Sequence, residues 1–412
     1  MQRRVVITGL GTYNPLGNDP DETWERIVAG ESGISSIEEL EQADLKTQFG
    51  GEVKNFDPVE LFGRKHARRM DRTTQFALAA AKQAIEDAQL VLTPELCDTV
   101  GVVLGCGMGN MGATIDGITA FNQRGPNRMS PFFIPMMLAD SPAATVSISH
   151  GLRGPNMAIA TACAAGNNAL GEAAKMIQRG AAEVMLAGGA EAPLLPAVIA
   201  GFNATGALST RNDDPLGASR PFDANRDGFV TSEGASIIVL EEESHALARG
   251  ASIYGEFLGY GTSADAYHVS APAEDGSGAI KAIESALDDA GLSPSDIDYI
   301  NAHGTSTKLN DQSETKAIKS VFGEYAYDIP VSSTKSMHGH MLGAAGAMEA
   351  LVSIKALEAQ FIPATINYAT PDPACDLDYV ANSGRASQID IFLSNGFGLG
   401  GHNATIIMGR YH

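Results

Sequence analysis

Two stretches, TQFALAAAKQAIEDAQL at residues 74–90 and SGAIKAIESALDDAGL at residues 277–292, place apolar side chains at the spacing of a helix. The two helices also resemble each other, because AIEDAQL at 84–90 aligns with ALDDAGL at 286–292. A short acidic loop follows each helix, and an apolar run that ends in glycine follows the loop. The sequence therefore predicts an internally duplicated fold, with one of these helices in each half.

Apolar runs that end in glycine-rich turns predict the strands. They lie at residues 4–11, 100–107, 157–166, 183–191, 297–305 and 391–401. Their nearly continuous apolar cores are typical of strands that are covered on both faces. Strands that alternate with helices indicate an α/β fold. We expect an N-terminal half at residues 1–250 and a C-terminal half at residues 251–412.

Composition excludes several classes of protein. The chain has 412 residues, of which 28 are Lys or Arg and 49 are Asp or Glu, for a net charge of −21. So acidic a chain argues against nucleic acid as the main partner. The 4 cysteines are scattered and form no C-x-x-C pair, and no stretch is apolar for the length of a membrane span. The first residues hold too short an apolar run for a signal peptide, so we expect a cytoplasmic protein without a membrane anchor.

Two glycine patterns invite a nucleotide-binding interpretation that the context does not support. GMGNMG at 107–112 and GFGLGG at 396–401 both fit G-x-G-x-x-G. A dinucleotide site also needs a helix that opens at the last glycine and an acidic residue about 20 positions later. The second match runs instead into a strand-like HNATIIM, and a glycine-rich chain produces such matches easily. We do not expect a nucleotide cofactor.

Cys163 is the first candidate for chemistry. It ends the apolar run MAIATA and opens a helix through AAGNNALGEAAKMIQ. A thiol at a helix N-terminus meets free backbone N–H groups and the positive end of the helix dipole, which lower its pKa and favour the nucleophilic thiolate. The alternative is a small buried apolar residue, the usual state of a free cysteine.

Two histidines favour the catalytic interpretation. His303 follows a strand in NAHGTST, and His340 lies in KSMHGHMLGAAG before a helix start. The duplication places the turn at 335–340 opposite the turn of Cys163, so His340 and Cys163 should meet. Either histidine alone could be structural, but a Cys with two His can support acyl transfer and carbonyl polarisation. The turn-rich, polar segment 205–232 is predicted to be a long functional loop.

Long motifs across the whole chain resemble one family. They are VVITGLGTYNPLG, GPNRMSPFFIPMM, TACAAG, ALSTRND, SRPFDANRDGFV, SADAYH, NAHGTST and SSTKSMHGHMLGAAGAMEA. The chain is similar to β-ketoacyl-[acyl-carrier-protein] synthases, closest to the KAS II type. The resemblance implies a thiolase fold of αβαβα layers with two mixed five-stranded sheets, a homodimer, and decarboxylative condensation of an acyl chain with malonyl-acyl carrier protein (ACP) in type II fatty acid synthesis.

The resemblance also implies roles for individual residues. Cys163 would carry the acyl chain, while His303 and His340 would hold the malonyl thioester and stabilise its enolate. Lys335 would organise this turn, with Glu314 as its ion-pair partner. The backbone N–H groups of Cys163 and Leu399 would form the oxyanion hole.

Further positions match the family's binding sites. Thr305 and Thr307 would hydrogen-bond phosphopantetheine, which arrives on the carrier protein, so no resident cofactor is required. Met108, Phe202 and Leu399 would line the substrate pocket. A site for structural Na⁺ or K⁺ is implied at Asn301, Glu349, Ser394 and Asn395.

Docking of a carrier protein has an electrostatic argument. Carrier proteins are acidic, so an acidic enzyme needs a local basic surface to bind them. GRKHARRMDR at 63–72 holds five basic residues, and its Lys65, Arg68 and Arg69 match the family's docking positions, with Arg128 as a further candidate. The alternative is an ordinary solvated basic helix face.

The chain departs from the family at three positions. Leu399 replaces the gating aromatic residue, Gly396 replaces a serine, and Gly206 stands where some members carry a docking arginine. A ketosynthase of a type II polyketide or other secondary pathway therefore stays open. A non-catalytic partner subunit would lack the nucleophilic cysteine, and a thiolase acting on CoA esters would carry a second cysteine in the last glycine-rich loop.

Overall fold

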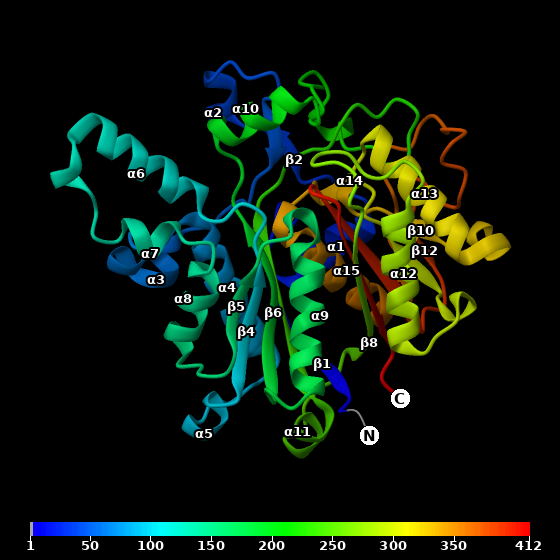
Figure 1. The fold of residues 1–412 in the computed structure, drawn as a ribbon, viewed down its shortest axis with the longest axis horizontal. Coiled ribbons are helices and arrows are strands. Elements are labelled where there is room, and N and C mark those ends of the chain that lie inside the picture. The colour runs from blue at the N-terminus through cyan, green and yellow to red at the C-terminus, as the bar shows by residue number, and fades with distance from the viewer. Residues whose placement is uncertain (1–2) are drawn as a thin grey trace.

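The strand order repeats between the two parts of the chain. The structure is a computed structural model that describes residues 3–412. One sheet of ten strands has the order β10-β9-β13-β14-β8-β1-β7-β6-β4-β5 (Figure 1). The strands are β1 (Val5–Tyr13), β4 (Val100–Gly105), β5 (Asn156–Ile159), β6 (Val184–Glu191), β7 (Gly234–Glu242), β8 (Gly255–Ala264), β9 (Tyr299–Asn301), β10 (Val331–Ser332), β13 (Ile391–Gly398) and β14 (His402–Gly409).

Each half contributes five of these strands in the same arrangement. Read outward from the centre, the N-terminal half runs β1-β7-β6-β4-β5 and the C-terminal half runs β8-β14-β13-β9-β10. The three outer strands of each half are parallel, and the two inner ones are antiparallel to their neighbours. β1 pairs with β8 through Val5–Phe257, Val6–Glu256 and Ile7–Gly255, which joins the two mixed sheets into one. The predicted duplication and fold class are confirmed.

Helices form the remaining layers. α9 (Ala165–Gln178) and α15 (Ala345–Ala359) contact each other and strands of both halves, and both are buried along most of their length. α4 (Arg72–Asp87) and α8 (Ser141–His150) cover the other face of the N-terminal strands. α12 (Ser277–Ala290) and α13 (Lys308–Phe322) belong to the C-terminal half, where α12 covers β8 and β14 and also packs on α13. The two helices predicted from the sequence are therefore α4 and α12, in equivalent positions.

Glycines set the distance between these helices and the central strands. A Cβ atom on Gly9 of β1 would lie 2.3 Å from the carbonyl oxygen of Ala84 in α4. A Cβ atom on Gly259 of β8 would lie 2.4 Å from the carbonyl oxygen of Ala286 in α12. No side chain fits at either contact, so the helix packs directly on the strand backbone. Ala84 and Ala286 begin the two segments that align in the sequence, which explains that similarity.

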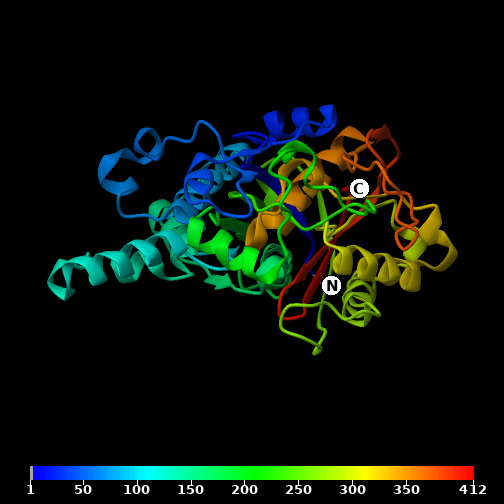
Figure 2. The ribbon, with the colours of Figure 1, turned by 90° about the horizontal axis from the view of Figure 1, so that it is seen from above.

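Two segments lie outside the layers of helices and strands. α6 (Met111–Arg124), η1 (Pro126–Arg128) and α7 (Phe133–Met137) form an arm that extends from the N-terminal half, on the left of Figures 1 and 2. Residues 206–233 follow α10 (Pro196–Thr205) and contain only one short helix, η3 (Pro215–Gly217), as the predicted loop requires. Among residues 3–412, no helix is both long enough and apolar enough to cross a membrane.

Candidate active site

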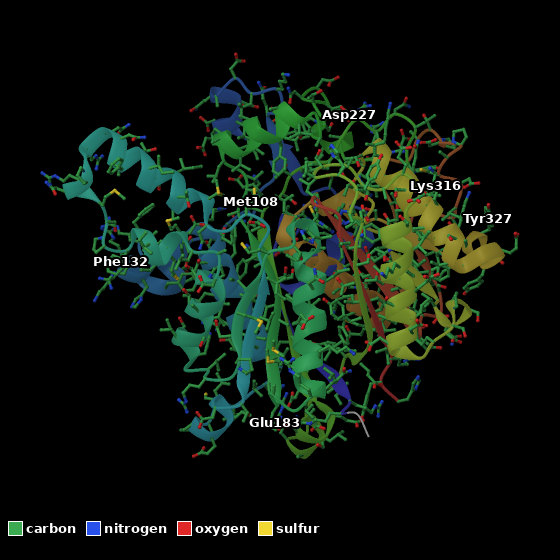
Figure 3. The ribbon with its side chains drawn as sticks, viewed as in Figure 1. Met108, Phe132, Glu183, Asp227, Lys316 and Tyr327 are labelled. Atoms are coloured by element: carbon green, nitrogen blue, oxygen red, sulfur yellow. The ribbon has the colours of Figure 1, made fainter. Side chains whose placement is uncertain are left out.

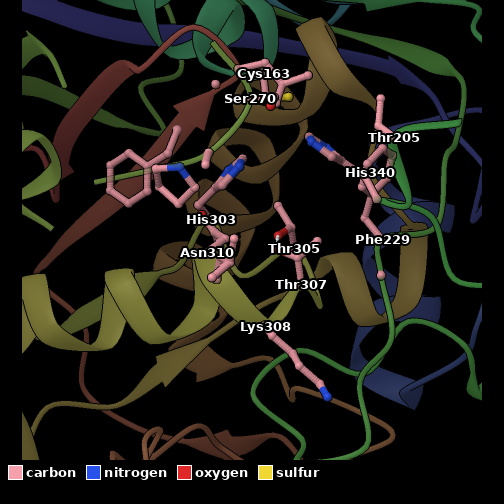
Figure 4. A pocket seen from close by; sticks show the side chains of 18 of the residues that line it. Cys163, Thr205, Phe229, Ser270, His303, Thr305, Thr307, Lys308, Asn310 and His340 are labelled. Carbon is pink, nitrogen blue, oxygen red and sulfur yellow. Dashed lines mark hydrogen bonds between the residues drawn. The ribbon is translucent and has the colours of Figure 1, made fainter. Parts of the chain in front are cut away.

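One cavity of about 590 Å³ brings together side chains from both halves. Its lining includes Cys163 from the N-terminal half and His303, His340 and Thr305 from the C-terminal half (Figure 4). Segment 205–232 contributes Phe229 to the wall and closes one side. The structure therefore brings the cysteine and both histidines into one pocket, and the duplication predicted the meeting of Cys163 with the turn of His340.

The turn that carries Cys163 has a constrained backbone. Ala162 has a φ of +49°, a conformation that side chains other than glycine seldom adopt. Cys163 follows in a short 3₁₀ turn, η2 (Ala162–Ala164), which leads directly into α9. This sharp change of direction places the thiol at the start of a long helix and at the pocket, with 9% of the residue exposed.

The acidity of Cys163 differs from the expectation. Burial raises the pKa of the thiol to about 11, although Lys335 and the backbone N–H groups of Leu399 and Cys163 lower it. The prediction that the helix N-terminus would yield a low pKa is wrong for the free protein, because desolvation of a thiolate outweighs these contacts. Its chemistry therefore begins from the thiol form.

The two histidines are held as neutral hydrogen-bond donors. Their ring centroids lie 5.4 Å apart in an edge-to-face arrangement. The Leu342 N–H donates to Nδ1 of His340 at 3.3 Å, and the Lys335 ammonium lies 3.5 Å from Nδ1 of His303. With Nδ1 accepting in both rings, the proton of each neutral imidazole is on Nε2. Burial and the positive charge of Lys335 hold both histidine pKa values well below their usual range.

Lys335 pairs with a different glutamate from the one expected. It lies in α14 (Lys335–His338), and its ammonium donates to the Glu349 carboxylate and, at 2.6 Å, to the carbonyl oxygen of His303. Glu314 instead accepts the backbone N–H groups of His303 and Gly304 at 2.7 and 2.8 Å. The predicted Lys335–Glu314 ion pair is therefore wrong. Glu349, on α15, is the ion-pair partner of the lysine, and Glu314 holds the backbone of the His303 turn in place through these two hydrogen bonds.

The last glycine-rich loop approaches the nucleophile closely. A Cβ atom on Gly398 would lie 2.7 Å from the Thr161 carbonyl oxygen and 3.1 Å from the Cys163 nitrogen, so only glycine fits. This approach places the backbone N–H of Leu399, together with that of Cys163 itself, near enough to the Cys163 sulfur to lower the pKa of the thiol. The Leu399 side chain lines the pocket and is 47% exposed. Two N–H groups that converge beside a nucleophile form the geometry of an oxyanion hole.

Met108 and Phe202 lie behind the cysteine rather than on the open cavity. Both are half-buried and pack against the apolar cluster that contains Cys163. Phe202 contacts Phe229 edge to face at 5.4 Å, and Phe229 contacts His340 at 5.3 Å. Phe229 was not singled out in the sequence, where it is one of two aromatic residues in a polar loop.

Polar and basic groups line the cavity beyond the histidines. The hydroxyl groups of Thr305 and Thr307 lie 2.9 Å apart. Of the two cations on the lining, Arg226 is buried and paired with Asp311 and Asp372. Lys308 is exposed and has no ion pair among residues 3–412. Lys308 was also missed, because a lone lysine at a helix start gives no signal in the sequence.

Three of the four residues proposed for a monovalent cation have an oxygen without a partner. Oδ1 of Asn301, Oε2 of Glu349 and Oγ of Ser394 are buried and accept no hydrogen bond. Asn301 and Ser394 are directly paired on β9 and β13. Oδ1 of Asn395 accepts from Thr405 at 2.8 Å instead. Unpaired oxygens of this kind suit Na⁺ or K⁺, so the residues present fit such an ion.

The basic surface predicted for docking lies on the side of the arm. Lys65 lies in α3 (Pro58–Ala67), and Arg68 and Arg69 follow directly; all three are exposed. The Arg69 guanidinium lies 4.2 Å from the ring centre of Phe132, which connects it to the segment of the exposed Arg128. Arg72 is not part of this surface, because it pairs with the buried Glu233.

Comparisons of sequence place the chain among known proteins. Two domain families match in order: Beta-ketoacyl synthase, N-terminal domain, over residues 2–246, and Beta-ketoacyl synthase, C-terminal domain, over residues 254–369. The chain is 50% identical over 410 residues to 3-oxoacyl-[acyl-carrier-protein] synthase 2 of Synechocystis sp., covering 100% of this chain and 99% of that protein. It is 48% identical over 409 residues to the protein of the same name from Staphylococcus aureus, covering 99% of each.

Comparisons with solved structures also find ketosynthases. A ketosynthase solved in complex with its type II polyketide acyl-carrier protein has a TM-score of 0.92 at 38% identity. A β-ketoacyl synthase from Burkholderia phymatum has a TM-score of 0.93 at 35% identity. Both similarities cover 100% of each chain.

Proposed function

The chain belongs to the β-ketoacyl synthase family, and on that premise we propose that it condenses an acyl chain with malonyl-ACP to give 3-oxoacyl-ACP in type II fatty acid elongation. Ketoacyl synthases are condensing acyltransferases, so this protein is an enzyme. The observation that carries the reaction is the pocket in which a thiol meets two neutral histidines and two converging backbone N–H groups. A non-catalytic subunit would not need these groups.

The first half-reaction is acyl transfer. The sulfur of Cys163 attacks the thioester carbonyl of acyl-ACP, and the oxygen becomes an anion held by the N–H groups of Cys163 and Leu399. Collapse of this intermediate breaks the bond to the pantetheine sulfur. The proton of the Cys163 thiol ends on that leaving sulfur, which departs as the free thiol. The raised pKa of Cys163 means that this proton is available at neutral pH.

The second half-reaction is decarboxylation followed by carbon–carbon bond formation. The Nε2–H groups of His303 and His340 donate to the thioester oxygen of malonyl-ACP, which favours loss of CO₂ because the electron pair passes to that oxygen as an enolate. The enolate carbon then attacks the acyl carbonyl on Cys163. The oxyanion again lies between the two N–H groups, and the sulfur of Cys163 leaves and takes up a proton to restore the thiol.

We infer that the carrier protein's phosphopantetheine arm runs from this centre past Thr305 and Thr307 to Lys308. The two hydroxyl groups suit the amides of the arm, and the free ammonium suits its phosphodiester. The basic surface of Lys65, Arg68, Arg69 and Arg128 would attract the acidic carrier in spite of the net charge of −21.

We also propose that the enzyme is a homodimer joined along β5. The two ends of the ten-stranded sheet differ: β10 is buried, whereas β5 is exposed over Asn156 and Met157. An unpaired edge of this kind is a template for another strand. Ile148 on α8, a helix that contacts β5, is 81% exposed, and Ile118 and Phe121 on the arm are each 52% exposed. Met157→Arg should convert a dimer to a monomer in analytical ultracentrifugation, and a wild-type monomer would refute the proposal.

A structural Na⁺ or K⁺ and a cytoplasmic location complete the proposal. The ion would bind the unpaired oxygens of Asn301, Glu349 and Ser394 and stabilise the base of the site, with no part in the chemistry. Thermal stability should then rise when K⁺ or Na⁺ replaces tetramethylammonium. Four free cysteines suit the reducing conditions of a cytoplasm.

A panel of acyl-ACPs of graded length, each supplied with malonyl-ACP, tests the function directly. Mass spectrometry should detect 3-oxoacyl-ACP two carbons longer than the acyl donor, and Cys163→Ala should abolish it. Successive additions without reduction would instead indicate a polyketide ketosynthase, the alternative to which the 38% identical ketosynthase complex belongs.

A further inference from the structure

Glu191, the last residue of β6, is fully buried beside the active site, and no step above uses it. Its Oε2 accepts the backbone N–H groups of Gly107 at 2.5 Å and Gly343 at 3.1 Å. Its Oε1 accepts the N–H of Met108 at 3.2 Å, and the thiol of Cys106 lies 3.6 Å away. One carboxylate therefore receives donors from a turn of the N-terminal half and from a turn of the C-terminal half.

The two turns reach Glu191 because both carry glycine. A Cβ atom on Gly107 would lie 2.8 Å from Oε2 of Glu191, and one on Gly343 would lie 2.7 Å from the same oxygen. The Gly343 Cβ would also lie 2.2 Å from the nitrogen of Gly107. The backbone is thus built closely around the carboxylate, which acts as the contact between the turns.

Each of these turns borders a different part of the site. Met108 packs in the apolar cluster behind Cys163, where the acyl chain of the proposed reaction would lie. Gly343 belongs to η6 (Leu342–Ala344), which begins two residues after His340 and whose Leu342 N–H donates to that histidine. A shift of the Glu191 carboxylate would therefore move the wall of the acyl site and the orientation of His340 together.

The charge of Glu191 also acts on the nucleophile. It raises the pKa of Cys163, adding to the larger effect of burial. Burial raises the pKa of Glu191 itself to about 7, although the three N–H groups oppose this, so the carboxylate is partly ionised at neutral pH. Two other groups act on this pair: the Cys106 thiol lowers the pKa of Glu191 through its hydrogen bond, and Lys335 lowers the pKa of Cys163. Asp71 acts one step away, by raising the pKa of Cys106.

We propose that Glu191 is a positioning residue for the condensation: its buried carboxylate fixes the Met108 wall of the acyl site against the His340 turn, and its negative charge acts on Cys163. The positioning part rests on the proposed function. The electrostatic part concerns Cys163 alone and can be measured without any carrier protein or acyl substrate.

Alkylation of Cys163 by iodoacetamide tests the electrostatic part. Glu191→Gln removes the charge and leaves one oxygen to accept the backbone N–H groups, so the Cys163 peptide should be alkylated roughly threefold faster at about pH 8, the effect of half a pKa unit. Glu191→Asp keeps the charge and should stay near the wild-type rate. Glu183 immediately precedes β6, at the end of the strand far from Met108 (Figure 3). The control variant Glu183→Gln should therefore be alkylated at the wild-type rate. Equal rates for Glu191→Gln and the wild type would overturn the electrostatic part.

The wild type provides a second test that needs no variant to fold. As pH rises through about 7, ionisation of Glu191 should make Cys163 harder to ionise, so log rate against pH should rise less steeply there than a single ionisation allows. A uniform unit slope from about pH 6 to 9 would refute the electrostatic part.

For the positioning part, Glu191→Gln should change the ratio of condensation rates between short and long acyl-ACPs, and an unchanged ratio would refute it. If the wild type makes no 3-oxoacyl-ACP, the proposed function fails while the alkylation result stands.

Discussion

Lys335 and Glu349 form an ion pair in which each side chain is only 1% exposed. The same ammonium donates to the carbonyl oxygen of His303 and lies 3.5 Å from Nδ1 of its ring. The lysine therefore links α14 to α15 and to the turn of a catalytic histidine. Together with burial, its charge keeps His303 and His340 neutral. One buried pair thus supports both the fold and the protonation state of the site.

Lys335→Met should destabilise the protein by about 3–5 kcal/mol, because it leaves the Glu349 carboxylate buried without a counter-charge. Urea unfolding measures this loss. The double variant with Glu349→Gln should recover much of the stability but not the condensation rate, since His303 still lacks the donor that orients it. An unchanged urea midpoint for Lys335→Met alone would contradict the importance of the pair.

His303→Ala and His340→Ala should each lower malonyl-ACP decarboxylation by about 100-fold or more, because each removes one donor to the developing enolate oxygen. Release of CO₂ measures this step. At least one variant should still form the acyl-enzyme on Cys163, since the oxyanion of that step is held by backbone N–H groups. Wild-type condensation by both variants would disprove the Cys-His-His mechanism.

The histidine pKa values predict the acid side of the pH profile. Both pKa values are held well below their usual range, so the neutral donors are fully present above pH 7 and are lost only as pH falls through the lowered values. Decarboxylation by Cys163→Ala, which isolates this step, should change less than about twofold between pH 7.5 and 6. A histidine with the ordinary pKa of about 6.5 would lose roughly three quarters of its neutral form there. Such a loss would contradict the assignment.

Charge reversal at Lys65, Arg68 and Arg69 should raise KM for acyl-ACP and weaken its dependence on salt, because the carrier is attracted by charge. Turnover of a small pantetheine thioester should change little. Lys316→Glu is the control, since Lys316 is exposed on the opposite side of the molecule (Figure 3). A similar loss with both substrates would indicate damage to the fold instead.

Leu399→Phe should keep condensation within about tenfold, or roughly 1.4 kcal/mol of barrier, because the backbone N–H of the oxyanion hole is unchanged. The larger side chain should narrow the range of acyl chains accepted, since position 399 lines the pocket and is 47% exposed. Kinetics with short, medium and long acyl-ACPs measure this. An identical chain-length profile would show that Leu399 is not a gate, and loss of activity with every substrate would show that the pocket had been rebuilt.

Much of the fold follows from local patterns in the sequence. The helices at 74–90 and 277–292 and the strands between them are visible because a buried face imposes its period on the chain. The repeat of Ala84 and Ala286 reflects the same requirement, a helix backbone that touches a glycine on a strand. The inner strands β7 and β8 were not predicted, because each lies in a stretch without a glycine-rich turn at its end.

By itself, the sequence determined the duplicated α/β fold, the meeting of Cys163 with the turn of His340, and the long pocket loop, because periodicity and repeated order express packing that is local or symmetric. The tertiary structure alone decided that Lys335 pairs with Glu349 rather than Glu314, that Cys163 has a raised pKa, and that Glu191 joins the two halves. These properties depend on burial and on distances between residues far apart in the chain, and charge and desolvation act through space rather than along the sequence.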